Sequence, residues 1–144
     1  MKLQKNILFK LRIALSFIFL WAFIDKLFGL GFATTKAQAW MNGGSPATGF
    51  LAHGVKGPFA SLFHSLANFP GIDFLFMGAL LFIGGTLLLN KYLKWGAWAG
   101  VCLLVLMWLA LLFPANNPLI DEHIIYALVL AYLATKSSHE LNWK

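Results

Sequence analysis

Charged side chains are scarce in this chain: they make up 11% of its 144 residues, whereas hydrophobic residues make up 60%. Soluble domains carry about 25% charged residues, so the composition excludes an ordinary soluble fold and predicts one membrane domain. The net charge of +6 does not indicate a nucleic-acid-binding protein. The positive residues stand at the ends of apolar stretches, as membrane orientation requires, and form no basic stripe on a polar face.

Cysteine occurs once, as Cys102 within an apolar stretch. A single cysteine excludes an intrachain disulfide, a Cys-x-x-Cys redox pair, a Cys-x-x-Cys-His haem attachment and a cysteine-ligated cluster. Cys102 is therefore interpreted as a packing residue. The four histidines lack the spacing of metal ligands, so the sequence predicts neither a metal nor a haem.

Apolar stretches dominate what the chain does contain. A helix needs about 20 apolar residues to cross a bilayer, and four stretches approach or reach that length. We therefore predict an all-α integral membrane protein: a single domain over residues 1–144 that forms a four-transmembrane-helix bundle. The first stretch is too long for a signal-peptide core and lacks a cleavage site, so it is a retained span. The predicted spans are 13–33, 72–89, 95–113 and 119–135.

The distribution of positive residues predicts the orientation. Eight lie on the side of the N-terminus and three on the other side, which favours a multi-pass protein of the cell (plasma or inner) membrane with both termini cytoplasmic. The eight are Lys2, Lys5, Lys10, Arg12, Lys91, Lys94, Lys136 and Lys144, and the three are Lys26, Lys36 and Lys56.

The connection 34–71 would be unusually long for a structureless loop. Ser45-Pro46 is typical of a helix start, and Gly54 can end that helix. Gly57-Pro58 starts a second short helix with one apolar face. We expect this outer loop to fold back as short interfacial helices, with Trp40 as an interfacial anchor.

Glycines within the predicted spans indicate where helices approach closely. Gly78, Gly84 and Gly85 permit close contact along the second span, and Gly96-x-x-x-Gly100 is a candidate packing face on the third.

Asp25 and Lys26 form an adjacent acid and base inside the first apolar stretch. Charges in a membrane segment are costly and tend to be kept for a function or a fixed partner. Two interpretations stay open: a site facing a ligand, or a structural role in which Lys26 extends to the interface and Asp25 pairs with it or with a neighbouring helix. Asp121 is well placed to cap the last helix, and His123 and Tyr126 share a face of that helix.

The polar residues of the predicted outer face suggest a site for a small anion. Backbone N–H groups at a helix start attract anions, and lysines nearby would add positive charge; a plain capped turn is the alternative. The candidate substrate-binding residues are Lys26, Lys56, Gly43, Gly44, Ser45 and His53.

Five stretches carry a resemblance to a known family: 11–13, 19–34, 40–51, 57–59 and 116–128, which include Leu20-Trp21-Ala22-Phe23-Ile24-Asp25-Lys26, Asn42-Gly43-Gly44-Ser45-Pro46 and Asn116-Asn117-Pro118-Leu119-Ile120-Asp121-Glu122-His123. On these the chain resembles the DoxX/DoxD family of four-span membrane proteins, and within it the membrane subunits of thiosulfate:quinone oxidoreductase. The resemblance implies oxidation of thiosulfate to tetrathionate, a quinone as electron acceptor, and a second subunit resembling DoxA. Membrane lipid and further copies of the chain are the other expected partners, and nucleic acid is not one.

A mechanism follows as a hypothesis. Thiosulfate would bind from outside at the candidate anion site, and a quinone would enter between the first and last spans near Trp21, Phe28 and Tyr126. Asp25 and His123 would relay the protons that quinone reduction consumes. Two rival functions come from other classes: a non-catalytic anchor or assembly subunit of a redox complex, and a small transporter or lipid-binding protein.

Overall fold

The computed structural model describes residues 2–115 and 117–136, and every regular element within them is helical. This confirms the predicted all-α class. Asn116 and Lys144, which entered the resemblance and the charge count, lie outside the described residues. In chain order the elements are α1 (Lys2–Phe28), the short turns η1 (Lys36–Gln38), η2 (Trp40–Asn42) and η3 (Phe50–Gly54), α2 (Ala60–Ala67), α3 (Ile72–Leu89), α4 (Leu93–Ala110) and α5 (Glu122–Ala134).

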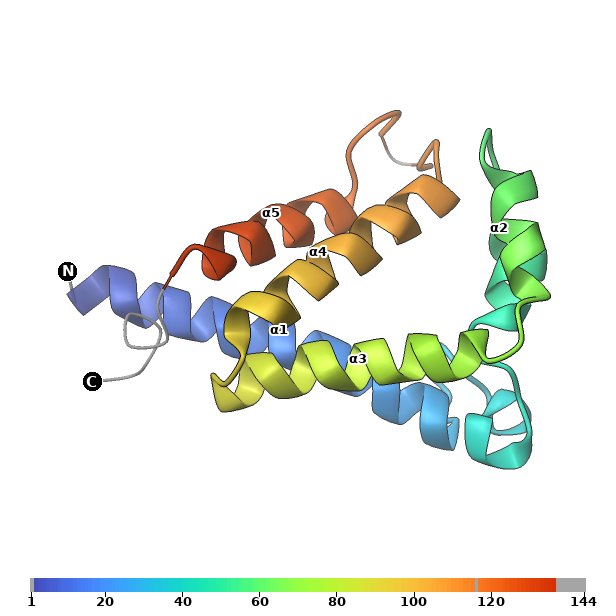
Figure 1. Ribbon diagram of the computed structural model, residues 1–144, viewed down its shortest axis with the longest axis horizontal. Helices are drawn as coiled ribbons and strands as arrows, with labels where there is room; N and C mark the ends of the chain where they lie inside the picture. The colour runs from blue at the N-terminus through green and yellow to red at the C-terminus, as the bar shows by residue number, and fades with distance from the viewer. Residues whose placement is uncertain (1, 116, 137–144) are drawn as a thin grey trace.

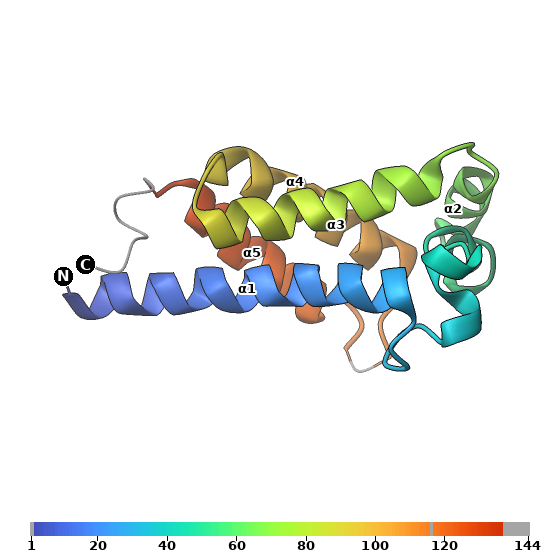
Figure 2. The ribbon, with the colours of Figure 1, turned by 90° about the horizontal axis from the view of Figure 1, so that it is seen from below.

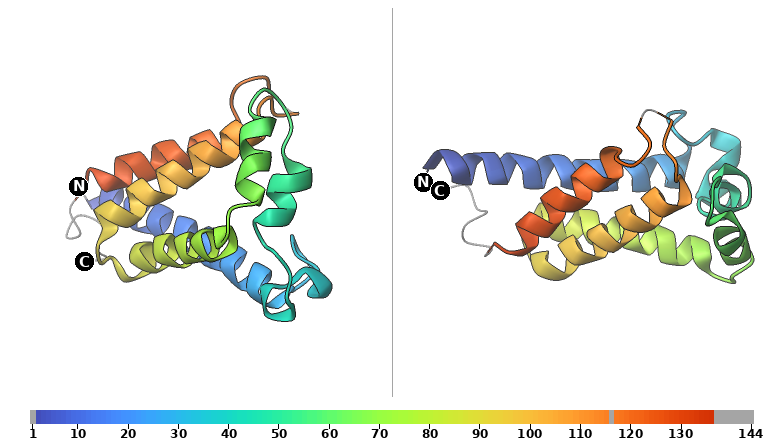
Figure 3. Two further views of the ribbon diagram at one scale, coloured as in Figure 1. Left: turned by 45° about the vertical axis from the view of Figure 1, so that its right-hand side comes forward. Right: turned by 90° about the horizontal axis from the view of Figure 1, so that it is seen from above.

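The four longer helices run up and down beside one another (Figures 1 and 2). α3 returns alongside α1, and α5 returns alongside α4, so the closest neighbours are α1 with α3 and α4 with α5. α1 and α4 end, and α3 and α5 begin, at one end of the molecule, which we call the loop end. α2 and the short turns lie across this end, with α2 running across the direction of the bundle (Figure 3).

Within the described residues, three helices are long and apolar enough to cross a membrane: α1 from Leu3, α3 and α4. α5 has 13 residues, fewer than the roughly 17 needed, so the fourth span stays a prediction. The predicted bounds hold for α3 and shift elsewhere. α1 begins at Lys2 instead of Ile13, because the basic residues there are good helix formers and continue the helix. α4 ends at Ala110 instead of Phe113, and α5 begins at Glu122 instead of Leu119.

α1 ends at Phe28, five residues before the predicted bound, because Gly29 turns the chain. Gly29 has φ +66°, a left-handed conformation that ends helices and favours glycine. Its N–H donates to the Asp25 carbonyl oxygen at 2.7 Å. A Cβ at Gly29 would also lie 2.6 Å from the backbone of Thr35 and Lys36. The tight return of the chain towards η1 therefore needs glycine for two reasons.

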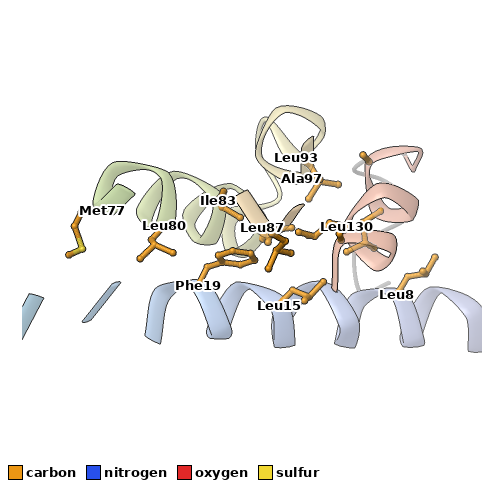
Figure 4. Close-up of a cluster of buried hydrophobic side chains, with 14 residues drawn as sticks. Leu8, Leu15, Phe19, Met77, Leu80, Ile83, Leu87, Leu93, Ala97 and Leu130 are labelled. Carbon is orange, nitrogen blue, oxygen red and sulfur yellow. The ribbon is translucent and has the colours of Figure 1, made fainter. Parts of the chain in front are cut away.

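One apolar core joins the four longer helices (Figure 4). Phe19 of α1 lies among Ile83 and Leu87 of α3, and Leu130 of α5 packs into the same cluster. Ile83, Leu87 and Leu130 are fully buried. Each such side chain contributes about 1.5–3 kcal/mol on burial from water, and dispersion contacts take over that role where lipid is the surroundings.

Some of the glycines predicted to allow close helix contact lie where two helices meet, and others do not. A Cβ on Gly96 would overlap the Thr86 side chain of α3, and a Cβ on Gly100 would lie 2.6 Å from Leu130. The Gly96-x-x-x-Gly100 packing face is therefore confirmed. Gly84 packs on Leu20 of α1, whereas Gly78 and Gly85 face open space, so the prediction for those two is wrong.

Two polar side chains of α1 donate hydrogen bonds to backbone carbonyl oxygens of α3. The Arg12 guanidinium, only 3% exposed, donates to the carbonyl oxygens of Leu87 and Leu88 at the C-terminus of α3. A cation there also suits the negative end of the helix dipole. The Ser16 hydroxyl, fully buried, donates to the Gly84 carbonyl oxygen at 2.8 Å. These bonds fix the register of the pair.

Candidate functional site

Asp25 holds the turn after α1 together. Its carboxylate is 1% exposed and accepts the backbone N–H groups of Phe32 at 3.3 Å and Ala33 at 3.0 Å. Both oxygens are thus engaged by the backbone seven and eight residues further on. This geometry fits the structural interpretation, in which Asp25 fixes the return of the chain after α1.

Asp73 of α3 occupies the helix start at which an anion was expected. Its Oδ1 accepts the N–H groups of Ala47 at 2.6 Å and Thr48 at 3.2 Å, and its Oδ2 lies 3.3 Å from the Thr48 hydroxyl. The N–H of Gly43 donates to the Trp40 carbonyl oxygen and that of Gly44 to Ala39. The N–H groups of Gly43, Gly44, Ala47 and Thr48 are therefore bonded to the protein's own groups, and the anion at this helix start is the Asp73 carboxylate.

An apolar cavity of about 850 Å³ lies at the loop end, between the short turns, α2, α3 and α4. Among the described residues, Lys26 at the end of α1 is the one charged side chain that lines it. Ala79, Ala99, Leu103 and Met107 are typical of the rest of the wall. Ligand pockets usually measure 300–1,000 Å³ and combine an apolar wall with a few placed polar groups, and this cavity has both properties.

Three of the predicted substrate-binding residues line this apolar cavity together: Lys26, Gly44 and Ser45. Cys102 lines it as well and is exposed, so the prediction that it only packs is corrected. Sequence reasoning did not find the contribution of α3 and α4. The available signal was the presence of small residues on these two helices, such as Ala79 and Ala99.

A second cavity of about 400 Å³ lies at the same end, beside the start of α5; we call it the polar cavity because four charged or titratable side chains are among its lining residues. Lys56, Asp121, Glu122 and His123 line it, so it gathers both predicted acid–base and substrate-binding residues. Asp121 caps α5 as predicted: its Oδ1 accepts the N–H groups of His123 at 3.0 Å and Ile124 at 3.4 Å. Its Oδ2 lies 2.8 Å from Nδ1 of His123.

The structure therefore separates residues that the sequence placed at one site. Lys26 lines the apolar cavity, whereas Lys56 and His123 line the polar one. Asp25 and His123, predicted to act together as a relay, likewise lie in different surroundings: Asp25 in the turn after α1 and His123 at the start of α5.

The predicted quinone residues lie elsewhere. Trp21 stacks on Phe17 with ring centroids 5.8 Å apart and meets the edge of Phe32 at 5.1 Å. Phe28 is 49% exposed, and Tyr126 packs against the main core. Trp21, Phe28 and Tyr126 do not line either of these two cavities, and the same holds for the exposed His53 of η3. α1 and α5 make few contacts with each other. The quinone site predicted between them stays a prediction.

The part of the chain that the structure describes contains no group of three or more histidine, cysteine or acidic side chains arranged to hold a metal ion. Comparison with protein-family models, curated proteins and solved structures finds no match for the chain. Fold and site together define the class of protein: an all-helical membrane-associated chain with an apolar cavity at one end. The resemblance to the DoxX/DoxD family stays a prediction.

Proposed function

We propose that this chain is the membrane subunit of a quinone-linked oxidoreductase and that its apolar cavity binds the quinone. The observation that carries the proposal is the cavity itself: it measures about 850 Å³, is largely apolar, and has Lys26 among its lining residues. In this proposal α5 is the fourth span, both termini are cytoplasmic, and the loop end faces outwards.

A quinone suits this cavity chemically. The ring and isoprenoid tail are apolar and pack against alanine, leucine and methionine side chains such as Ala99, Leu103 and Met107. The two carbonyl oxygens accept hydrogen bonds, and Lys26 offers the cationic donor for one of them. Such a bond strengthens as electrons arrive on the ring, so Lys26 would favour the reduced states.

The electron donor in this proposal is thiosulfate, as the family resemblance implies. Two thiosulfate dianions join through a new S–S bond to give tetrathionate and two electrons. The quinone takes these two electrons and two protons and becomes the quinol, so the reaction balances. The resemblance also implies a second subunit resembling DoxA, and the activity assay must therefore include such a partner.

Cys102 offers a direct test of quinone binding, because it is the chain's one cysteine and lines the cavity. We expect a fully substituted short-chain quinone to slow alkylation of Cys102 by a maleimide in the purified protein. Ala99→Phe places a ring inside the cavity and should abolish the protection. Ala14→Phe is the matched control, because Ala14 is exposed on α1 and lines neither cavity. Protection that Ala99→Phe leaves intact would exclude this cavity.

Lys26→Met tests the polar contact, because methionine keeps most of the length and removes the charge. A hydrogen bond to a charged group contributes about 1.5–3 kcal/mol, so affinity for the quinone should fall about tenfold or more. Lys36→Met is the control, since Lys36 is exposed and lines neither cavity. Equal affinity in both variants would contradict a bond from Lys26 to the quinone.

Thiosulfate-dependent quinone reduction tests the reaction. The purified protein is assayed in detergent, alone and with a DoxA-like partner, beside the Ala99→Phe and Ala14→Phe variants. Activity that Ala99→Phe removes and Ala14→Phe retains supports the proposal. Quinone binding without activity in either condition would overturn thiosulfate as the donor.

A non-catalytic anchor or assembly subunit is the second candidate function. Asp25 and Asp73 lie at or near the ends of membrane helices, and their carboxylates accept backbone N–H groups of the outer loop. These bonds fix the conformation of the loop end. A subunit that docks a partner needs such a defined surface. This alternative expects a bound partner and no protection of Cys102 by quinone.

A further inference from the structure

The polar cavity brings a histidine and a carboxylate into a fixed geometry. Nδ1 of His123 lies 2.8 Å from Oδ2 of Asp121, and the two side chains are 13% and 10% exposed. A carboxylate only accepts hydrogen bonds, so the proton of this bond resides on Nδ1 of the imidazole. Nε2 of a neutral ring is then the nitrogen with a free lone pair. Nε2 has no hydrogen-bond partner among the described residues, and His123 lines the cavity.

Hydrogen bonds to the backbone fix the position of the Asp121 carboxylate, and this carboxylate in turn orients the His123 ring. One carboxylate oxygen caps α5 through two backbone N–H groups, and the other faces the imidazole. A carboxylate that turned away from the imidazole would also uncap the helix. A histidine oriented by a fixed carboxylate is the arrangement in which a side chain accepts and returns protons.

We propose that His123, positioned by Asp121, is a proton-exchange site that takes up and releases protons through the polar cavity. The inference rests on the proposed function and deepens it, because quinone reduction consumes two protons and joining two thiosulfates releases none. The other charged groups that line the cavity are Lys56, which follows η3, and Glu122 in the first turn of α5. The described lining residues between the end of α4 and Asp121 carry no charge.

The polar cavity is close to the apolar one. Ala110, at the end of α4, lines the apolar cavity, and the next residue, Leu111, lines the polar one. The N–H of Lys56 donates to the Ala110 carbonyl oxygen at 3.3 Å, which joins the segment after η3 to the same point. Val55, Phe63 and Ala110 form a small buried cluster there. The backbone at Ala110 and Leu111 therefore lies between the two cavities at this point.

The protonated nitrogen of His123 is the first observable, and it needs neither quinone nor thiosulfate. Nitrogen NMR of histidine-labelled protein in detergent, with His123→Gln to assign the signal, reports which nitrogen carries the proton in the neutral ring. We expect Nδ1 in the wild type. In Asp121→Asn the amide still caps α5, since asparagine caps as well as aspartate, but its NH₂ faces Nδ1 and moves the proton to Nε2. A wild-type ring protonated on Nε2 overturns the proposal.

The pH profile of quinone reduction is the second observable. His123→Gln should lower the rate about 100-fold, at the low end of the range for positioned proton-transfer groups, and flatten its dependence on pH. Asp121→Asn should alter the same profile with helix content unchanged. His64→Gln is the control, because His64 is exposed on α2 and lines neither cavity. An unchanged pH profile in His123→Gln overturns proton exchange at this site. Failure of the wild-type protein to bind quinone would instead overturn the proposed function of the apolar cavity.

Discussion

The hydrogen bonds of Asp25 predict how much the turn after α1 is destabilised when this carboxylate is removed. Asp25→Ala removes two hydrogen bonds to a charged acceptor, from the N–H groups of Phe32 and Ala33. Such bonds contribute about 1.5–3 kcal/mol each. Phe32 is 73% exposed, so water can replace the lost acceptor and the low end of this range applies. The turn should lose about 3 kcal/mol in all, which corresponds to about 100-fold in its opening equilibrium.

Amide hydrogen exchange measures this opening at the residues concerned. In Asp25→Ala the amides of Phe32 and Ala33 should exchange about 100-fold faster, whereas those of Ala47 and Thr48 should be unchanged. Asp73→Ala is the reciprocal control, because Asp73 accepts the N–H groups of Ala47 and Thr48. It should accelerate that pair and leave the first pair protected.

Amides of Phe32 and Ala33 that stay as protected in Asp25→Ala as in the wild type would contradict this role of Asp25. The carboxylate would then not hold the turn and would be free for another role. The proton relay through Asp25 that the sequence suggested would return as the better account of a buried acid near the end of α1.

Two further predictions concern the helix contacts. Gly96→Val should lower the free energy of unfolding by about 1–3 kcal/mol, because its side chain would overlap Thr86. Gly78→Ala should raise it by up to about 1 kcal/mol, because Gly78 faces open space inside α3 and alanine favours helix. Unfolding in a denaturing detergent measures both, and equal costs would contradict the packing. Arg12→Met should cost about 2 kcal/mol, because two carbonyl oxygens at the end of α3 lose their donor. The exposed Lys10→Met is its control, and an equally stable Arg12→Met would refute the bond.

Much of the fold could be predicted because local rules decide it. The bounds of α3, the helix cap at Asp121 and the packing face of Gly96 and Gly100 depend on apolar length, capping chemistry and side-chain size. The start of α1 was missed for a local reason too. Lysine marks the end of a membrane span, but it also favours helix, so the helix continues through the basic flank to Lys2.

The site could be predicted only in part. The residues of the loop end were identified, but their grouping depends on contacts between distant segments. That Asp73 reaches Ala47, and that Lys26 and Lys56 line different cavities, follows from how the outer loop packs against α3 and α4. A cavity is a volume left between elements, and it has no signature in sequence spacing.

The central claim is that the apolar cavity holds the quinone, and photolabelling tests it most directly. A photoreactive quinone analogue is bound to the purified protein, irradiated, and located by peptide mapping. The account predicts labels on the cavity walls of α3 and α4, around Ala79, Leu103 and Met107, and their loss in Ala99→Phe. Labels instead on Trp21, Phe28 and Tyr126, outside both cavities, would contradict the account and restore the quinone site that the sequence alone suggested.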